Sequence, residues 1–520
     1  MKNIIKKFIA SMVVLSFVLL LSGTVSSTST TNTITKINQR DSVYFLMTDR
    51  FYDGDKTNNM NVIKDDLTQY QGGDFQGVID KLDYIKDLGF TTIWISPVVK
   101  NDIGGYHGYW ANDFYKTNEH FGSLEKLKEL VKKAHEKGMK VIVDLVVNHT
   151  GPGFAKASDP KYANWFHPRI DISDYNDQNQ VENGWLAGLP DLNQENPEVS
   201  KYLIDMSKWW IKETGIDGYR LDTFRHVPKS FWITFSKEIK KDYPNFYLIG
   251  EVFSGDASYV GGFQDSGADG LLDFPTYYAA SDVFKGDKPA SYLGEMINNE
   301  GSIYKNRNLM GTFIDNHDVP RFVSQIYNLK NERLKSALTF MMTYTGIPVL
   351  YYGTEIGMDG GTDPDNRRNM DFNVKSPITD YVKKLNNIRK SNKALTMGNI
   401  EVLKYDDNIL CYSRSYENNT VIVAFNTTDL VQKSEFSVPK KYIKQYKLAT
   451  DVISTKDISI NNGNVKIDMA PMQARVFVFD NSKLKIYDYA IYMVLSAVVI
   501  FLILGAWALR IYKQRSNNKS

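Results

Sequence analysis

The chain has 520 residues, and this length predicts about two to four domains rather than one small core. Its net charge of +2 is close to neutral, so the composition does not predict a nucleic-acid partner. The single cysteine, Cys411, excludes an intramolecular disulfide framework and any metal site built from cysteines.

The N-terminus has the pattern of a secretory signal peptide. Lysines precede an apolar run over 8–21, and small residues follow that run. The run of about 14 residues is shorter than the roughly 20 residues that a helix needs to span a bilayer. We therefore expect residues 1–27 to be a signal peptide, with an uncleaved anchor as the alternative. Residues 28–40 are expected to form a flexible leader.

Between residues 41 and 394, short apolar runs with strand character alternate with helical patterns. The predicted strands are 43–47, 92–96, 140–147, 218–222, 246–250, 271–274, 309–314 and 349–352. The predicted helices are 76–88, 123–137, 198–214 and 229–241. Repeated strands and helices with buried apolar strands predict a (β/α)8 TIM barrel, whose chemistry lies at the carboxyl ends of the strands.

Two further segments depart from this alternation. Segment 150–193, after the third strand, is long, has no clear period and is rich in tryptophan and tyrosine. A loop of this length is usually functional, so we expect a small inserted subdomain over the cleft. Over 395–480 the pattern changes to short alternating apolar runs, which predicts a separate all-β sandwich domain.

The C-terminal segment 489–509 carries no charged residue and is mostly apolar. Its roughly 21 residues, at about 1.5 Å each, cover the roughly 30 Å hydrocarbon thickness of a bilayer. The tail 510–520 contains basic but no acidic residues. The positive-inside rule then predicts a transmembrane helix with a cytoplasmic tail and a body at the extracellular face of the cell membrane. A buried core helix is the alternative.

Acidic residues follow several of the predicted strands, where a barrel places its chemistry. Asp222 ends the fourth strand, Glu251 follows the fifth, and Asp318 follows the seventh. Residues two apart on a strand point to one face, so Arg220 is expected to hold the carboxylate of Asp222. Residues 218–222 alone are equally consistent with a structural ion pair between Arg220 and Asp222, and the other acids favour a shared active site.

Three carboxylates in one barrel mouth, with histidines and aromatic residues nearby, fit the chemistry of glycoside hydrolysis. Asp222, held by Arg220, suits the nucleophile that attacks the anomeric carbon. Glu251 suits the protonated acid, because burial after an apolar strand and the negative charge of Asp318 raise the pKa of a carboxyl group.

The chain resembles the α-amylase family of retaining glycoside hydrolases over residues 41–480. The segments that carry the resemblance are DLVVNH at 144–149, GYRLDTFRH at 218–226, GEVF at 250–253, FIDNHD at 313–318 and LPDLN at 189–193. The resemblance implies that Asp222 is the nucleophile, Glu251 the acid/base and Asp318 the transition-state stabiliser. It implies an α-glucan substrate such as starch, glycogen or maltooligosaccharides. The substrate-binding residues that it implies are Tyr109, His149, Arg220, Arg225, His226, Phe253, His317, Asp363 and Arg367.

A closer likeness is to the branch that contains cyclodextrin glucanotransferases and maltogenic amylases, and it implies calcium as cofactor. The residues that resemble the extra calcium site of this branch are Asp53, Asp55, Asn58, Asn59, Gly72 and Asp74. Oxygen ligands and a glycine for a tight turn suit calcium, and a turn cluster of Asn and Asp is the alternative. A second site, resembling the common calcium site of the family, uses Asn148, Asp191 and the carbonyl of His226.

Two departures from the glucanotransferases argue against cyclisation. Counting back from Asp191, Ala187 takes the place of their central aromatic residue, and a predicted membrane helix takes the place of their starch-binding domains. Arg225 stands where lysine is common, and its planar fork forms different hydrogen bonds. The predicted function is hydrolysis of α-1,4-glucosidic bonds, with a transglycosylase or a cyclodextrin- or pullulan-degrading hydrolase as alternative. A non-catalytic sugar-binding surface protein is a remote alternative, because such relatives lose the acids.

Overall fold

The computed structural model describes residues 36–438 and 448–479, together with residues 498, 500, 502–508 and 510. The predicted signal peptide, the leader up to residue 35 and most of the predicted membrane helix at 489–509 lie outside these residues. Within the described part of the chain, no helix is long and apolar enough to cross a membrane.

Eight parallel strands form a barrel sheet in the order β8-β7-β6-β5-β2-β1-β10-β9. Their bounds are β1 (Val43–Leu46), β2 (Thr92–Ile95), β5 (Lys140–Leu145), β6 (Gly218–Leu221), β7 (Tyr247–Gly250), β8 (Gly270–Leu271), β9 (Gly311–Thr312) and β10 (Ile347–Tyr351). A parallel bridge between Leu272 and Gly311 joins the two ends of this order. The predicted barrel is therefore confirmed, with each strand near its predicted position.

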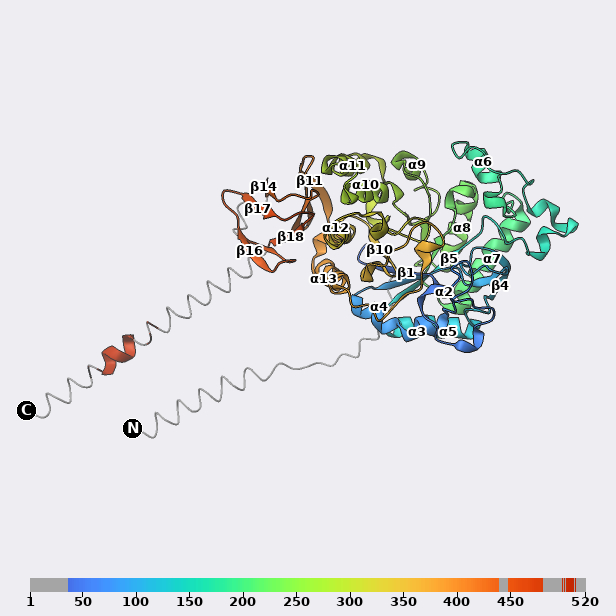
Figure 1. Ribbon diagram of the computed structural model, residues 1–520, viewed down its shortest axis with the longest axis horizontal. Coiled ribbons are helices and arrows are strands. Elements are labelled where there is room, and N and C mark those ends of the chain that lie inside the picture. The colour runs from blue at the N-terminus through green and yellow to red at the C-terminus, as the bar shows by residue number, and fades with distance from the viewer. Residues whose placement is uncertain are drawn as a thin grey trace, which may run out of the picture. The chain divides into compact units, whose positions relative to one another are not determined.

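Helices surround the strands of the barrel (Figure 1). Their bounds are α3 (Phe75–Asp80), α4 (Leu82–Leu88), α5 (Leu124–Glu136), α7 (Pro197–Thr214), α8 (Lys229–Asp242), α10 (Phe274–Lys285), α11 (Ala290–Ile303), α12 (Lys330–Thr343) and α13 (Pro377–Ser391). Helix α7 shows how local sequence sets their ends. Asn196 caps its N-terminus, Pro197 occupies the first turn, and Gly215 closes the C-terminus with a φ of 71°.

The helix predicted over 76–88 is wrong as one continuous element, because the structure has α3 and α4 there. The chain turns at Lys81, whose ψ of 7° ends α3. Gly77 of α3 lies so close to the loop before it that a Cβ atom would be 1.7 Å from the carbonyl oxygen of Tyr52. The apolar spacing runs across the break, so it could not reveal the turn.

The inserted segment 150–193 leaves the barrel after β5 and returns to it at α7. It contains the short elements η2 (Ala155–Ala157), η3 (Pro160–Trp165), α6 (Gln178–Asn183) and η4 (Leu186–Gly188). Antiparallel bridges pair His149 with Asp191 and Phe166 with Leu192. The two ends of the segment therefore meet beside the carboxyl end of β5.

The C-terminal domain is all-β, as predicted. Its strands are β11 (Asn399–Tyr405), β12 (Ile409–Tyr416), β13 (Asn419–Asn426), β14 (Gln432–Ser437), β15 (Leu448–Asp451), β16 (Lys456–Ser459), β17 (Asn464–Met469) and β18 (Ala474–Phe479). They form a six-stranded sheet and the two-stranded sheet β14-β17. Apolar side chains of both sheets share one buried cluster, in which the rings of Phe436 and Phe477 lie 5.7 Å apart.

Packed aromatic side chains lie inside the barrel, below the carboxyl ends of its strands. Phe45 of β1 stacks on Trp94 of β2 with ring centroids 3.9 Å apart, and lies 5.2 Å from the ring of Tyr351 on β10. The ring of His317 contacts Phe45 from above at 5.1 Å, edge to face. The guanidinium of Arg220 lies 5.4 Å from the Trp94 ring. His317 and Arg220, at the mouth of the barrel, therefore pack directly against these aromatic rings.

Candidate active site

Arg220, which is 0% exposed on β6, is the centre of a buried charge network. Its Nη1 donates to Asp222 Oδ1 at 2.6 Å and to Asp144 Oδ1 at 2.9 Å, and its Nη2 donates to Glu251 Oε1. Asp144 is the direct register partner of Arg220 on the neighbouring strand β5. Three carboxylates from three consecutive barrel strands therefore share one guanidinium.

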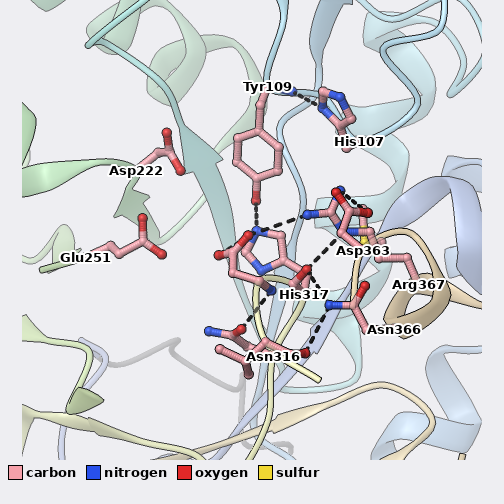
Figure 2. A network of polar contacts seen from close by, with 12 residues as sticks. His107, Tyr109, Asp222, Glu251, Asn316, His317, Asp363, Asn366 and Arg367 are labelled. Carbon is pink, nitrogen blue, oxygen red and sulfur yellow. Dashed lines mark hydrogen bonds and ion pairs between the residues drawn. The ribbon is translucent and has the colours of Figure 1, made fainter. Parts of the chain in front are cut away.

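Asp222 and Glu251 follow β6 and β7, and each is 5% exposed. Their carboxylates lie next to each other, across from Tyr109 and His317 (Figure 2). Glu251 Oε2 also accepts a hydrogen bond from the backbone N–H of Thr223 at 3.1 Å. Burial, reinforced by the charge of Asp318, raises the pKa of Glu251 well above its usual range, although Arg220 opposes the shift. This shift favours the protonated form of Glu251, which is the form that a general acid requires.

Tyr109 and His317 form a stacked pair opposite these acids, with ring centroids 5.3 Å apart. The Tyr109 hydroxyl donates to Asp144 Oδ2 at 2.9 Å and lies 2.6 Å from His317 Nε2 (Figure 2). Burial lowers the pKa of His317 well below its usual value, with the charges of Arg220 and Arg367 as further causes. The His317 imidazole is therefore neutral and can both donate and accept hydrogen bonds.

Arg367 connects Asp318 to Asp363. Its Nη2 lies 3.5 Å from Asp318 Oδ1, its Nη1 lies 3.1 Å from Asp363 Oδ1, and its Nε donates to the His317 carbonyl at 2.9 Å. The side chain of Asp318 is 30% exposed, so it faces the open space rather than the core. Asp363 and Arg367 lie on the side of the site away from Glu251 (Figure 2).

A cavity of about 380 Å³ opens over these groups. Its lining contains nine of the predicted site residues, which are Tyr109, His149, Asp222, Arg225, His226, Glu251, Phe253, His317 and Asp318. Arg220 lies buried beneath it, and Asp363 and Arg367 adjoin it through Asp318. The remaining lining residues are Tyr175, Thr223, Leu186, Ala187 and Leu189.

The two other histidines of the lining are neutral as well. The ring of His149 bonds the Tyr109 carbonyl through Nε2 at 3.1 Å, and burial lowers its pKa. The ring of His226 bonds the Val181 carbonyl through Nδ1 at 3.0 Å, and burial lowers its pKa to about 4. His226 thus ties the inserted segment to the chain just after Asp222.

Asp144 and Tyr175 belong to the site but are missing from the predicted set. Asp144 stands inside its strand rather than after it, and its pairing with Arg220 is the signal that reveals it, since neighbouring parallel strands place register partners side by side. Tyr175 lies in a segment without periodicity, and no sequence pattern brings it to the cavity.

Buried oxygen atoms without hydrogen-bond partners test the first predicted calcium site. Among the described residues, Asp53 Oδ1, Asn58 Oδ1 and Asn59 Oδ1 are such atoms. Gly72, with a φ of 94°, approaches so closely that a Cβ atom would lie 2.6 Å from Asn59 Oδ1. Unpaired buried oxygens of acids and amides fit a hard cation.

Two other predicted residues of this site use their carboxylates differently. Asp55 Oδ1 accepts from the N–H of Thr57 at 3.0 Å, and Asp74 accepts from the N–H groups of Asp55 and Gly77 at 2.7 and 2.6 Å. These side chains shape the loop. Among the described residues, no group of three or more His, Cys, Asp or Glu side chains is placed to hold a metal, so amide and carbonyl oxygens would have to complete the shell.

The second predicted calcium site shows the same kind of unpaired oxygen. Asn148 Oδ1 and Asp191 Oδ1 are buried and have no hydrogen-bond partner within the described part of the chain. The other oxygen of Asp191 lies 2.6 Å from Nδ1 of His167. Asn148 belongs to the barrel and Asp191 to the inserted segment, so a shared cation would join the two.

Two family models match the chain. The model described as alpha amylase, catalytic domain, matches residues 45–380, and the model described as maltogenic amylase, C-terminal domain, matches residues 400–476.

Curated relatives include enzymes of two kinds. The chain is 41% identical to a "Beta/alpha-amylase" of Paenibacillus polymyxa over 88% of this chain and 39% of the relative. It is 36% identical to a "Cyclomaltodextrin glucanotransferase" of Thermoanaerobacterium thermosulfurigenes over 82% of this chain and 65% of the relative. The chain therefore spans less than two thirds of the length of these relatives.

Matches to solved structures of similar proteins extend over nearly the whole length of those proteins. An α-amylase from Anoxybacillus shares 45% identity with a TM-score of 0.82, over 85% of this chain and 98% of that one. A three-domain cyclomaltodextrin glucanotransferase, CldA, shares 31% identity with a TM-score of 0.77, over 84% of this chain and 99% of that one. The matched catalytic domain, the barrel and the acids at its mouth agree: the chain belongs to the α-amylase family of glycoside hydrolases.

Proposed function

We propose that this chain is an extracellular retaining glycoside hydrolase that cleaves α-1,4-glucosidic bonds of starch, glycogen or maltooligosaccharides. The observation that carries the proposal is that Arg220 contacts both Asp222 and Glu251 beneath a cavity that Asp318 also lines. Carboxylates on neighbouring nitrogens of one guanidinium lie close together. This favours the roughly 5–5.5 Å carboxylate spacing of retaining enzymes over the roughly 6.5–9.5 Å of inverting ones.

The proposed reaction has two steps. A carboxylate oxygen of Asp222 attacks the anomeric carbon, the glycosidic C–O bond breaks, and the proton of Glu251 goes to the leaving oxygen. The Glu251 carboxylate then takes a proton from water, whose oxygen attacks the anomeric carbon and frees Asp222. The raised pKa of Glu251 supports its role as the acid.

The other predicted site residues are proposed to contact the sugar units of the substrate. Tyr109 stacks under the sugar whose bond is cleaved, and Asp318, His149 and His317 bond its hydroxyl groups. Asp363 and Arg367 bind the next sugar on the side away from Glu251, where Figure 2 places them. Phe253 and His226 also line the cavity.

Calcium is the proposed cofactor at both predicted sites. The unpaired oxygens of Asp53, Asn58 and Asn59, and those of Asn148 and Asp191, support this assignment. When bound, calcium supplies cross-links between loops rather than chemistry at the substrate.

We also propose that residues 1–27 direct export and that residues 489–509 anchor the enzyme in the membrane, with the basic tail 510–520 inside the cell. The charge-free apolar run and the basic tail support this location. Removal of residues 489–520 is expected to release activity into the medium, and activity that stays with the membrane fraction would contradict the anchor.

Transglycosylation is the second candidate function. The small side chain of Ala187 lines the cavity at the position where the glucanotransferases carry their central aromatic residue, which favours hydrolysis. The number of domains carries no weight in this choice, because the three-domain protein CldA is itself a cyclomaltodextrin glucanotransferase. The membrane helix predicted in place of starch-binding domains therefore does not argue against cyclisation.

A product profile on starch, pullulan, cyclodextrin and a maltooligosaccharide tests the proposal. We expect short linear products and reducing ends from starch, lost in Asp222→Ala. Cyclic or lengthened products as the main outcome would favour the transferase. A folded protein that releases no sugar, or release that survives in Asp222→Ala, would favour the non-catalytic alternative.

A further inference from the structure

Asn366 holds the backbone on both sides of Asp318. It belongs to the short element η9 (Asp365–Arg367) and is 0% exposed. Its Nδ2 donates to the carbonyl of His317 at 2.8 Å and to the carbonyl of Val319 at 3.0 Å (Figure 2). These two residues stand directly before and after Asp318. One amide group therefore bridges the loop that carries the third acid of the site.

The neighbouring contacts fix the orientation of this amide. The backbone carbonyl of Asn366 accepts from Nε of Arg321 at 2.9 Å. Arg321 is itself fully buried, and its guanidinium lies 4.0 Å from the centroid of the Tyr351 ring. Among the described residues, Oδ1 of Asn366 has no hydrogen-bond partner. A flipped amide would set this oxygen against two carbonyl oxygens, so Asn366 serves the loop as a donor.

The backbone of Asp318 is held more closely than its carboxylate. The carboxylate oxygens lie 3.4 Å from Nε2 of His317 and 3.5 Å from Nη2 of Arg367. By contrast, the N–H of Asp318 donates to Oδ1 of Asn316 at 2.8 Å. Hydrogen bonds between nitrogen and oxygen are usually no longer than about 3.2 Å. The position of the carboxylate therefore depends mainly on the backbone that carries it.

We propose that Asn366 is a positioning residue, which sets the carboxylate of Asp318 for the transition state by holding the carbonyls on either side of it. Asn366 is buried and does not line the cavity, so it acts through Asp318 rather than on the sugar. A displacement of about 1 Å in such a group can cost about 10²-fold in rate. The inference rests on the proposed function, because it takes the role of Asp318 from that reaction.

Kinetics on two substrates test this role. Asn366→Ala removes both donated bonds, and kcat on maltohexaose is expected to fall about 10²-fold with KM nearly unchanged, since Asp318 acts mainly in the transition state. In α-maltosyl fluoride, fluoride leaves as the C–F bond breaks and Asp222 bonds the anomeric carbon. The loss on this substrate should be about as large, because the action of Asp318 does not depend on the leaving group. Asn369→Ala, at an exposed asparagine whose amide donates to Gln71 at 3.0 Å, is the matched control.

A double-mutant cycle on the fluoride separates positioning from a general loss of structure. In the Asp318→Asn background, Asn366→Ala is expected to add little further loss. The carbonyl of His317 keeps a second donor, Nε of Arg367 at 2.9 Å, so the change falls mainly on Asp318. Asn366→Ser, which keeps one donor, should lose less than Asn366→Ala, and it replaces that variant in the cycle if the melting curve shows that Asn366→Ala is unfolded.

Four results would overturn the inference: no loss, a rise in KM without a fall in kcat, a loss confined to maltohexaose, or a loss that is undiminished in the Asp318→Asn background. In each of these cases the wild type still turns over both substrates, so the proposed function stands. A wild-type enzyme that turns over neither substrate would overturn the proposed function, and this inference with it.

Discussion

Arg220 sets the charge balance of the site at the scale of single residues. One guanidinium faces the carboxyl groups of Asp144, Asp222 and Glu251, so the buried cluster has more acids than cations. Burial raises the pKa of Asp144 to about 7 and raises that of Glu251 well above its usual range. Raised pKa values favour the protonated carboxyl form, which a general acid requires.

The pH profile tests the assignment of Glu251. The protonated form of Glu251 is the active form, and its pKa is raised. On the alkaline side of the profile, wild-type kcat/KM on starch is therefore expected to fall as pH rises through that raised pKa. Glu251→Gln is expected to lose about 10²–10⁴-fold in kcat on starch and to lose the alkaline limb. It should lose less on α-maltosyl fluoride, whose first step needs no acid. An alkaline limb that is the same in the variant would contradict the assignment.

A second buried carboxyl pair, Glu300 and Asp273, lies away from the cavity. The Thr276 hydroxyl lies 3.0 Å from Glu300 Oε1 and 2.7 Å from Asp273 Oδ2. Burial, with the charge of Asp273 as the next cause, raises the pKa of Glu300 to about 8. The folded state therefore keeps a proton that the unfolded state loses near its ordinary pKa of about 4.3. This contribution to stability is complete below that pKa and is lost as pH rises to about 8.

We expect the melting temperature of the wild type to fall more steeply between pH 5 and 8 than that of Glu300→Gln, since one such proton changes stability by up to about 1.4 kcal/mol per pH unit. Scanning calorimetry across this range measures the difference. Glu295→Gln, at an exposed position of the same helix, serves as the control. Parallel curves for wild type and Glu300→Gln would contradict the linkage.

The places of single acidic residues at the barrel mouth were predictable, because their positions after strands decide them. Asp222, Glu251 and Asp318 follow strands, and a barrel brings such residues to one mouth. The bonds of Arg225 were not predictable, because both of its acceptors are backbone carbonyls of distant segments. The place of Tyr175 was not predictable either, because it lies in a segment without periodicity.

At the scale of elements, Arg414 joins the β-domain to the barrel. From β12, its Nη1 donates to the carbonyl of Thr343 at 2.7 Å and to that of Tyr344, and its Nη2 donates to the carbonyl of Gly398 at 2.9 Å. The first two carbonyls lie at the C-terminal end of α12, which leaves its last carbonyls without helical partners. The fully buried guanidinium therefore caps a barrel helix from another domain.

Arg414→Leu is expected to lower the free energy of unfolding by about 2–5 kcal/mol, because it leaves buried carbonyls without donors. Arg414→Lys, which keeps the charge and one donor, should lose less. Thermal unfolding measures both, with Arg40→Leu at an exposed site as the control. A melting temperature equal to that of the control would show that the cap adds no stability.

Element positions followed from the sequence where the apolar period changes, as between the strands and helices of the first half of the barrel. The turn at Lys81 between α3 and α4 did not, because the apolar spacing continues across it. The long helices α10 to α13 cover the strands of the second half of the barrel, where the sequence indicated strands alone.

At the scale of the whole molecule, bound calcium is expected to hold loops of the barrel and the inserted segment together. Excess chelator should lower the melting temperature by several degrees, since a ligand at about 100 times its Kd stabilises by about 2.7 kcal/mol. The shift should shrink in Asn59→Ala and in Asn148→Ala, each of which removes one unpaired oxygen. A melting temperature that chelator leaves unchanged would count against calcium.

The architecture of the barrel and the all-β domain was predictable, because repeated apolar strands leave few ways to pack. The balance between hydrolysis and transglycosylation was not predictable, because no sequence pattern shows that Tyr175 of the inserted segment lines the cavity. The anchor at 489–509 rests on its sequence pattern, which cell fractionation tests.

Covalent trapping tests the central claim, that Asp222 becomes bonded to the sugar, most directly. Incubation with a 5-fluoro-α-glycosyl fluoride, which slows the second step more than the first, should leave a glycosyl group on the enzyme. Peptide mass spectrometry is expected to find that group on Asp222, and to find none in Asp222→Ala. An active enzyme that forms no adduct, or an adduct on another carboxylate, would contradict the account.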